Sequence, residues 1–126
     1  MIDINKQIAY WKDGSYEDWL VANELVDNGR IRHGLFFAHL ALEKILKAHV
    51  CKKIGDLSPR THNLLKLAEL AKLELSSQQT SALAIINSFN LEGRYPETEL
   101  PVPSKKQAAM YIEGAEEILQ WLTQAL

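Results

Sequence analysis

The sequence predicts an all-α fold, an up-and-down antiparallel bundle of four to five helices in a single domain over residues 1–126. Apolar residues recur at helical spacing along nearly the whole chain, and no segment has a convincing period-two strand pattern. Turn-forming residues separate the helical stretches at "DNGR", at "DLSPRT" and in a proline-rich segment after residue 89. The short connections favour antiparallel neighbours, as in helix bundles.

The first helix is expected over roughly residues 3–28. Gly14 costs about 1 kcal/mol inside a helix, and Ser15 with Asp18 could cap a new one, so a break here is the alternative. The apolar phase holds across the glycine, which favours one long helix ended by Gly29 as a left-handed cap. The positions that follow this 3–4 rhythm are Ile8, Trp11, Trp19, Ala22 and Val26, with Ser15 filling the gap.

The second helix, "IRHGLFFAHLALEKILKAHVCKKIG", has the strongest helical pattern. Phe36 and Leu40 widen its apolar surface beyond one stripe, as packing on several sides requires. Its four lysines at 44, 47, 52 and 53 need solvent or partners. The expected buried stripe consists of Leu35, Ala38, Leu42, Ile45 and Leu46.

Three further helices complete the bundle. The third is "HNLLKLAELAKL", the fourth opens at Ser76 or Ser77, and the last covers roughly residues 105–125 behind a Ser104–Gln107 capping box. The positions expected to be buried are Leu64, Leu67, Ala68 and Ala71 in the third helix, Ala82, Ile85, Ile86 and Phe89 in the fourth, and Ala108, Ile112, Ala115, Leu119 and Leu122 in the last.

Composition limits the environment and the partners. A net charge of −2 gives no global attraction to nucleic acid, so any such binding needs a local patch. The N-terminus lacks the pattern of a signal peptide and no apolar run is long enough to span a bilayer, so we expect a cytoplasmic location without a membrane partner. Trp11, Trp19, Phe36 and Phe37 are more apolar surface than a small bundle hides, which predicts self-association.

Four segments in order resemble the HEPN domain family of prokaryotes: "EDWLVANEL" in the first helix, "AHLALEKILKA" in the second, "THNL" at the start of the third, and "RYP" after the fourth. Each is weak alone, but together they cover nearly the whole chain. The resemblance implies a homodimeric bundle commonly encoded beside a minimal nucleotidyltransferase, in a toxin–antitoxin-like pair. Many members are metal-independent ribonucleases, while others are thought to bind a nucleotide or to be the transferase's substrate.

The segment "RYPETELPVP" departs from the ribonuclease members, which carry an arginine followed after four to six residues by a histidine. Arg94 is present, but Glu99, Leu100 and Pro101 stand where the histidine should fall. Metal-independent cleavage needs a base for the 2′-hydroxyl proton and a cation for the phosphate. Arg94 can supply the cation, and the base is missing unless His33, His39 or His62 comes close. Arg32 and His39 satisfy the spacing formally, but within the second helix, and we interpret that match as coincidence.

The expected ligand-binding residues are Arg94, Tyr95, Lys44, Lys47, Glu43 and Asp18. Lys44 or Lys47 pointing toward Arg94 would help bind a nucleotide or RNA phosphate. The alternative is a solvated Glu43–Lys47 ion pair worth about 0.2–0.5 kcal/mol. Asp18 is equally suited to be a buried partner for one of these cations, because an unpaired buried charge is costly.

Tyr95 precedes Pro96, which favours an extended backbone at the tyrosine. Its ring then either covers the helices, with Arg94 capping the preceding one, or offers a stacking surface or an acceptor for a nucleotidyl group. His39 is expected to face Glu43 one turn away, since a metal site from His39, Glu43 and His62 lacks a recognisable ligand spacing. We expect neither a metal nor a cofactor.

Three functions remain open. The first is a nucleotide- or RNA-phosphate-binding partner of a minimal nucleotidyltransferase, with uncertain catalysis. The second is a dimeric toxin ribonuclease using Arg94 and a non-standard base such as His39. The third is a non-catalytic protein-interaction module.

Overall fold

The computed structural model describes residues 2–91 and 101–126 of the chain. Its described part is an all-α bundle of five helices, as predicted. The first, α1 (Ile4–Asp27), is capped by Asp3, whose side chain accepts from the backbone N–H of Lys6 at 3.1 Å. It runs through Gly14 without a break, which confirms the single long helix. Ser15 fills a core position because its Oγ donates to the carbonyl of Ala41 at 2.7 Å.

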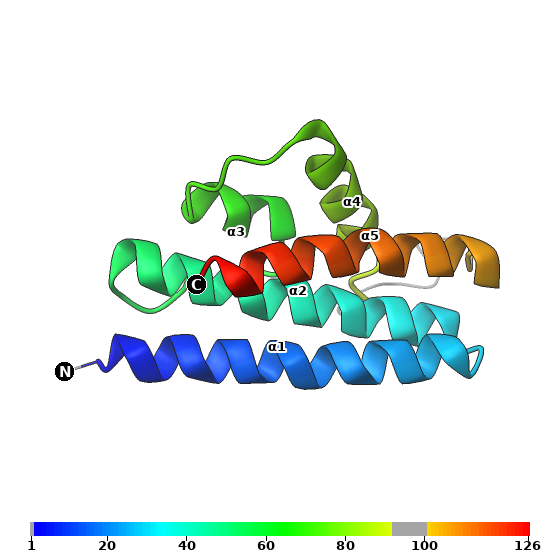
Figure 1. Cartoon of the computed structure of the whole chain (residues 1–126), viewed down its shortest axis with the longest axis horizontal. Helices are drawn as coiled ribbons and strands as arrows, with labels where there is room; N and C mark the ends of the chain where they lie inside the picture. The colour runs from blue at the N-terminus through cyan, green and yellow to red at the C-terminus, as the bar shows by residue number, and fades with distance from the viewer. Residues whose placement is uncertain (1, 92–100) are drawn as a thin grey trace.

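A three-residue turn reverses the chain into α2 (Ile31–Ile54), which lies antiparallel beside α1 (Figure 1). Gly29 adopts φ 80°, the left-handed conformation predicted for it. Four residues into α2, Gly34 permits a close approach of the two helices. A Cβ atom there would lie 2.4 Å from Val26 Cγ2 and 3.0 Å from the Val26 backbone nitrogen.

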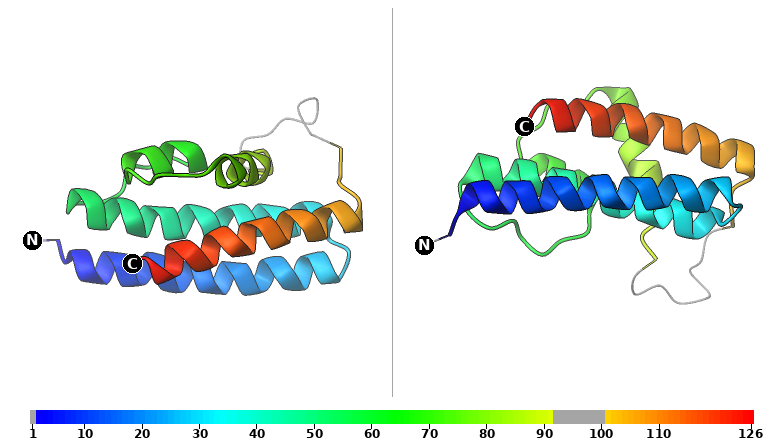
Figure 2. Two further views of the ribbon diagram at one scale, coloured as in Figure 1. Left: turned by 45° about the horizontal axis from the view of Figure 1, so that its top comes forward. Right: turned by 60° about the horizontal axis from the view of Figure 1, so that its bottom comes forward.

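The centre of the bundle is α2, which contacts all four other helices (Figure 2). Its predicted stripe is confirmed, since all of its members are fully buried. This is why α2 is apolar over more than one face: α1 covers one side, and the later helices cover the others. The members are Leu35, Ala38, Leu42, Ile45 and Leu46.

The short helix α3 (Leu64–Leu70) buries the predicted face but is shorter than expected at both ends. Asn63 is its N-cap rather than a helical residue, accepting from the N–H groups of Leu65 and Lys66. Lys72 has φ 54°, a left-handed conformation that ends the helix.

Helix α4 (Ser77–Asn87) begins at the predicted Ser76 cap, which forms a capping box with Gln79. Its predicted buried face was partly wrong. Ile85 is 38% exposed and Ala82 only partly buried, whereas Leu83 and Ile86 are buried. All five consecutive residues 82–86 of this helix are apolar, so the sequence period does not determine the buried face, and packing against α2, α3 and α5 does.

The last helix, α5 (Lys105–Gln124), follows the predicted Ser104–Gln107 capping box and runs antiparallel to α1 (Figure 1). Its five predicted core positions are buried, together with Ile118. Two connections are longer than the short turns expected, spanning residues 55–63 and 88–104.

Candidate functional site

Three polar residues at four-residue spacing form a row on α2 and are buried inside the bundle: His39, Glu43 and Lys47. We call them the polar row. Residues four apart lie on the same face of a helix, so the row is continuous. Their exposed fractions are 0%, 5% and 7%, far below those of a solvated face. The sequence-based interpretation of Glu43–Lys47 as a solvated pair was therefore wrong.

Glu43 is the centre of this row. Its Oε2 accepts a hydrogen bond from Lys47 Nζ at 3.0 Å, and its Oε1 lies 3.0 Å from Nδ1 of His62, in the connection before α3. The same Oε1 is 3.7 Å from Nδ1 of His39. Because a carboxylate only accepts hydrogen bonds, His62 carries its proton on Nδ1.

His39 is held by the backbone of the same connection. Its Nε2 lies 2.9 Å from the carbonyl oxygen of His62, so Nε2 carries the proton and donates. Burial lowers the pKa of His39 below its ordinary value of 6.5, although the nearby Glu43 carboxylate acts in the opposite direction. A fully buried neutral imidazole does not suit the role of a proton acceptor for RNA.

Lys47 is covered by α1 rather than by solvent. Its Nζ lies 5.1 Å from the centre of the Trp11 ring, within the range of a cation–π contact. Helical spacing predicted that Trp11 belongs to the apolar stripe, but it does not indicate which residue of a second helix covers a lysine, so this contact was not predicted. The row is thus enclosed by α1 on one side and by the connection before α3 on the other.

Lys44 and Asp18 form a separate pair between α2 and α1. Lys44 Nζ lies 2.7 Å from Asp18 Oδ2, so Asp18 is the cation's partner that the sequence suggested. The lysine stem crosses Gly14, where an added Cβ would lie 3.1 Å from Lys44 Cδ. With 29% of its side chain exposed, Lys44 is more accessible than Lys47.

The end of α4 is fixed beside the start of α3. The backbone N–H of Leu64 donates to Oδ1 of Asn87 at 2.9 Å, two residues after His62. The Asn87 side chain also acts on the pKa of His39. Asn87, the last residue of α4, therefore ties the end of this helix to the start of α3. Arg94 and Tyr95 belong to that connection and lie outside the described residues.

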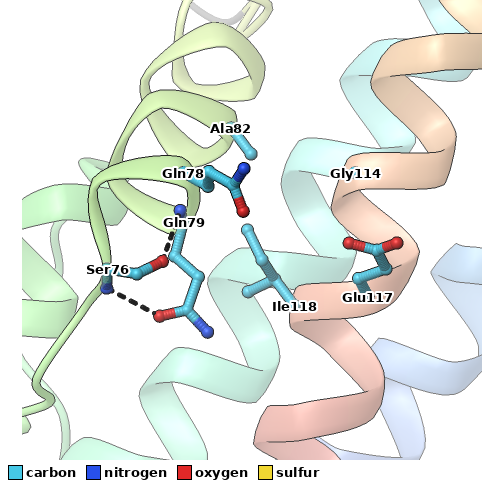
Figure 3. Close-up of a pocket in the computed structure, with 7 residues that line it drawn as sticks. All are labelled: Ser76, Gln78, Gln79, Ala82, Gly114, Glu117 and Ile118. Atoms are coloured by element: carbon cyan, nitrogen blue, oxygen red, sulfur yellow. Dashed lines mark hydrogen bonds between the residues drawn. The ribbon is translucent and has the colours of Figure 1, made fainter.

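Two pockets on the surface lie away from the polar row. One pocket of about 370 Å³ lies between the start of α4 and the middle of α5 (Figure 3). Ser76 and Gln79 bond to each other there, which satisfies the first turn of α4. A groove of smaller volume, about 280 Å³, lies between α1 and the end of α5, with Tyr16 and Trp19 on one side and Leu119 on the other. Neither contains a member of the polar row.

Over residues 2–91 and 101–126, no group of three His, Cys, Asp or Glu side chains is arranged to hold a metal ion. Of the five helices, none combines the length and the apolar character that a membrane crossing requires.

The described residues form a five-helix bundle with a buried polar row on its central helix, α2. The HEPN domain family profile matches residues 8–125, and the chain belongs to this family. TT1696 from Thermus thermophilus has the same fold, with a TM-score of 0.77 at 19% identity over 95% of this chain and 98% of that one. ST0689, an archaeal HEPN homologue, gives 0.73 at 17% identity over 94% and 96%. Among curated proteins, none matches the sequence.

Proposed function

We propose that this HEPN protein binds the phosphate of a ribonucleotide or of RNA as a homodimer, and that it partners a minimal nucleotidyltransferase in a toxin–antitoxin-like pair. The observation that carries the proposal is the family match over residues 8–125, which includes the Arg94-Tyr95-Pro96 segment. Arg94 supplies a guanidinium suited to phosphate, and Tyr95 a ring suited to stacking on a base.

Lys44 and Lys47 have different roles in this proposal because they differ in exposure and in their partners. Lys44 is part-exposed, and its single described partner is Asp18, so a phosphate can compete for it. Lys47 lies under Trp11 and against Glu43, and is too buried to meet a ligand. We therefore assign ligand contact to Arg94, Tyr95 and Lys44, modulated by Asp18, and a supporting role to Glu43 and Lys47.

Titration with ATP and with a single-stranded oligoribonucleotide tests the binding. Arg94→Ala is expected to weaken affinity about 10- to 100-fold, because a hydrogen bond to a charged group contributes about 1.5–3 kcal/mol. Lys44→Ala should weaken it less. Lys53→Ala, an exposed lysine at the end of α2, serves as the matched control. Failure of the wild-type protein to bind either ligand would favour a protein-interaction module instead.

The homodimer is tested separately. Trp19 is already buried within one chain, so it contributes less to self-association than the sequence suggested. The apolar side chains that α1 leaves exposed are Tyr10, Tyr16 and Leu20, at 66%, 63% and 42%. Light scattering at micromolar concentration should give twice the chain mass, and a monomeric mass would refute this part. Co-purification with a nucleotidyltransferase encoded beside the protein tests the partner.

A further inference from the structure

The groove between α1 and the end of α5 continues past the pocket at Tyr16 and Trp19. A second pocket, of about 220 Å³, lies one helical turn nearer the start of α1, at Lys12 and Asp13. The two pockets share three lining residues, so they form one surface, which we call the α1–α5 groove. The shared residues are Tyr16, Leu119 and Thr123.

The α1–α5 groove has an apolar floor that is only partly covered. Trp19 and Leu119 are buried at its base, whereas Tyr16 and the neighbouring Leu20 are exposed. Removing this apolar surface from water is favourable, and exposed apolar patches beside polar rims mark interaction sites. The groove therefore suits a partner that brings bulky apolar side chains.

The helices on both sides of the groove are acidic. Residues 13–29 and 107–126 contain no lysine or arginine. Asp18 pairs with Lys44, but over the described residues no other acid of these two stretches lies within ion-pair distance of a cation. Asp13 and Glu116 line the groove itself, where Lys12 is the one basic residue among the described lining residues. Charge complementarity thus favours a cationic partner. The acids without a cation are Asp13, Glu17, Glu24, Asp27, Glu113, Glu116 and Glu117.

The architecture favours a helix as the bound segment. The described residues contain no strand, so the groove offers no sheet edge to pair with an extended peptide. An extended segment would leave its backbone groups without partners there, whereas a helix satisfies its own. The two pockets are one turn of α1 apart, about 5.4 Å, which matches side chains at i and i+4 of a helix lying along α1.

A second copy of this chain is the competing occupant, because Tyr16 and Leu20 could also meet across a two-fold axis. A two-fold contact places the same patch on both subunits. Here it would bring acidic helices together without cations between them, which is unfavourable. Electrostatics therefore leave the groove to a different partner.

We propose that the α1–α5 groove binds a cationic amphipathic helix of a protein partner, with its apolar side chains in the two pockets and its lysines or arginines against Asp13 and Glu116. This inference rests on the protein partnership in the proposed function and adds the surface and the chemistry of the bound segment. Phosphate binding at Arg94 does not enter it.

The test uses two synthetic helical peptides with leucines at i, i+3, i+4 and i+7, one with lysines at its polar positions and the other with glutamates. Fluorescence anisotropy should show that the wild-type protein binds the lysine peptide about tenfold or more tightly than the glutamate peptide, less so at high salt. Equal binding of the two peptides, or binding of neither, overturns the inference and leaves the proposed function standing.

The position of the peptide is tested with matched variants. Tyr16→Ala should weaken binding of the lysine peptide about tenfold, as loss of an aromatic interface residue does. Tyr10→Ala is the control, since Tyr10 is equally exposed on α1 but does not line the groove. Glu116→Gln should weaken binding about two- to fivefold, and Glu74→Gln, the same charge change in the connection before α4, should not.

Equal losses in Tyr16→Ala and Tyr10→Ala would overturn the placement. A dimer mass that falls to that of one chain in Tyr16→Ala would assign the groove to a second copy and overturn it too. If the nucleotidyltransferase co-purifies with Tyr16→Ala as it does with the wild-type protein, the partnership stands but not at this groove. Absence of co-purification with the wild-type protein overturns the partnership itself, whatever the peptides do.

Discussion

The two sides of α2 are built on different principles. Toward α1 the contact is close and continuous: Gly34 brings the backbones together, Ser15 bonds to the Ala41 carbonyl, and Lys44 crosses Gly14 to reach Asp18. Toward α3 and α4 the buried apolar residues Leu64, Leu67 and Leu83 share one core with α2, and Glu43 and His39 also anchor the connection before α3 by bonding to His62. The first side is a close fit of two long helices, and the second adds a buried carboxylate and its hydrogen bonds to the apolar packing.

The largest expected effect lies on the second side. Glu43→Ala should destabilise the fold by about 3–5 kcal/mol, because it leaves the buried Lys47 ammonium without its partner. Urea unfolding followed by circular dichroism measures the change. Glu43→Ala/Lys47→Met should recover much of the loss, and failure to recover it would mean that packing rather than charge holds this side.

The matching test of the first side is Gly34→Ala. The added Cβ would meet the backbone of Ala22 and Val26, which cannot rotate away, so α1 and α2 must separate. We expect a loss of about 1–3 kcal/mol by the same unfolding measurement. An unchanged midpoint would show that the helices part at little cost.

Acidification should act on two buried histidines of α2, His39 beside the connection before α3 and His49 beside α5. Burial lowers the pKa of both His39 and His49, so below the ordinary value of 6.5 the unfolded chain binds protons that the folded one does not. Stability is then complete above about pH 6.5 and falls as the pH drops toward the folded-state pKa values. Unfolding midpoints at about pH 7.5 and pH 5 measure this loss. His49→Gln, which keeps a donor for Leu122, should reduce the loss, and an unchanged pH dependence would exclude His49 as a source.

The smallest effect is expected at Gly14→Ala. Its Cβ would meet only the flexible stem of Lys44, which is part-exposed and able to shift by a few tenths of an ångström. The gain in helix propensity, up to about 1 kcal/mol, should then exceed the weakening of a part-exposed ion pair. A lower melting temperature would instead show that Lys44 must keep its path across the glycine.

The sequence predicted what local rules control and missed what depends on contacts between helices. Gly29, Ser76 and Ser104 ended or began helices as expected, since their roles follow from backbone conformation and capping. The prediction of the buried face of α4 was partly wrong. Residues 82–86 are all apolar, so their spacing does not indicate which side of the helix is buried. Lys47 is buried because Trp11 covers it, and no spacing along one chain predicts that contact.

The candidate site followed the same division. The spacing of His39, Glu43 and Lys47 placed them on one face of a helix, but it did not show whether that face meets water or protein. His62 entered the sequence analysis as one of three histidines able to serve as a base. The contact between His62 and Glu43 joins residues 19 positions apart. The connection that carries His62 has no periodic sequence pattern, so its path could not be predicted.

The three-residue turn between α1 and α2 has a consequence for folding order. Neighbouring helices joined by so short a turn lose little chain entropy on meeting, so the α1–α2 pair is expected to form early. Glu43 and Lys47 pair within a single helix and can do so while still hydrated. Their dehydration then awaits the closure of residues 55–63 over α2, which makes the docking of His62 a late event in the folding of this chain.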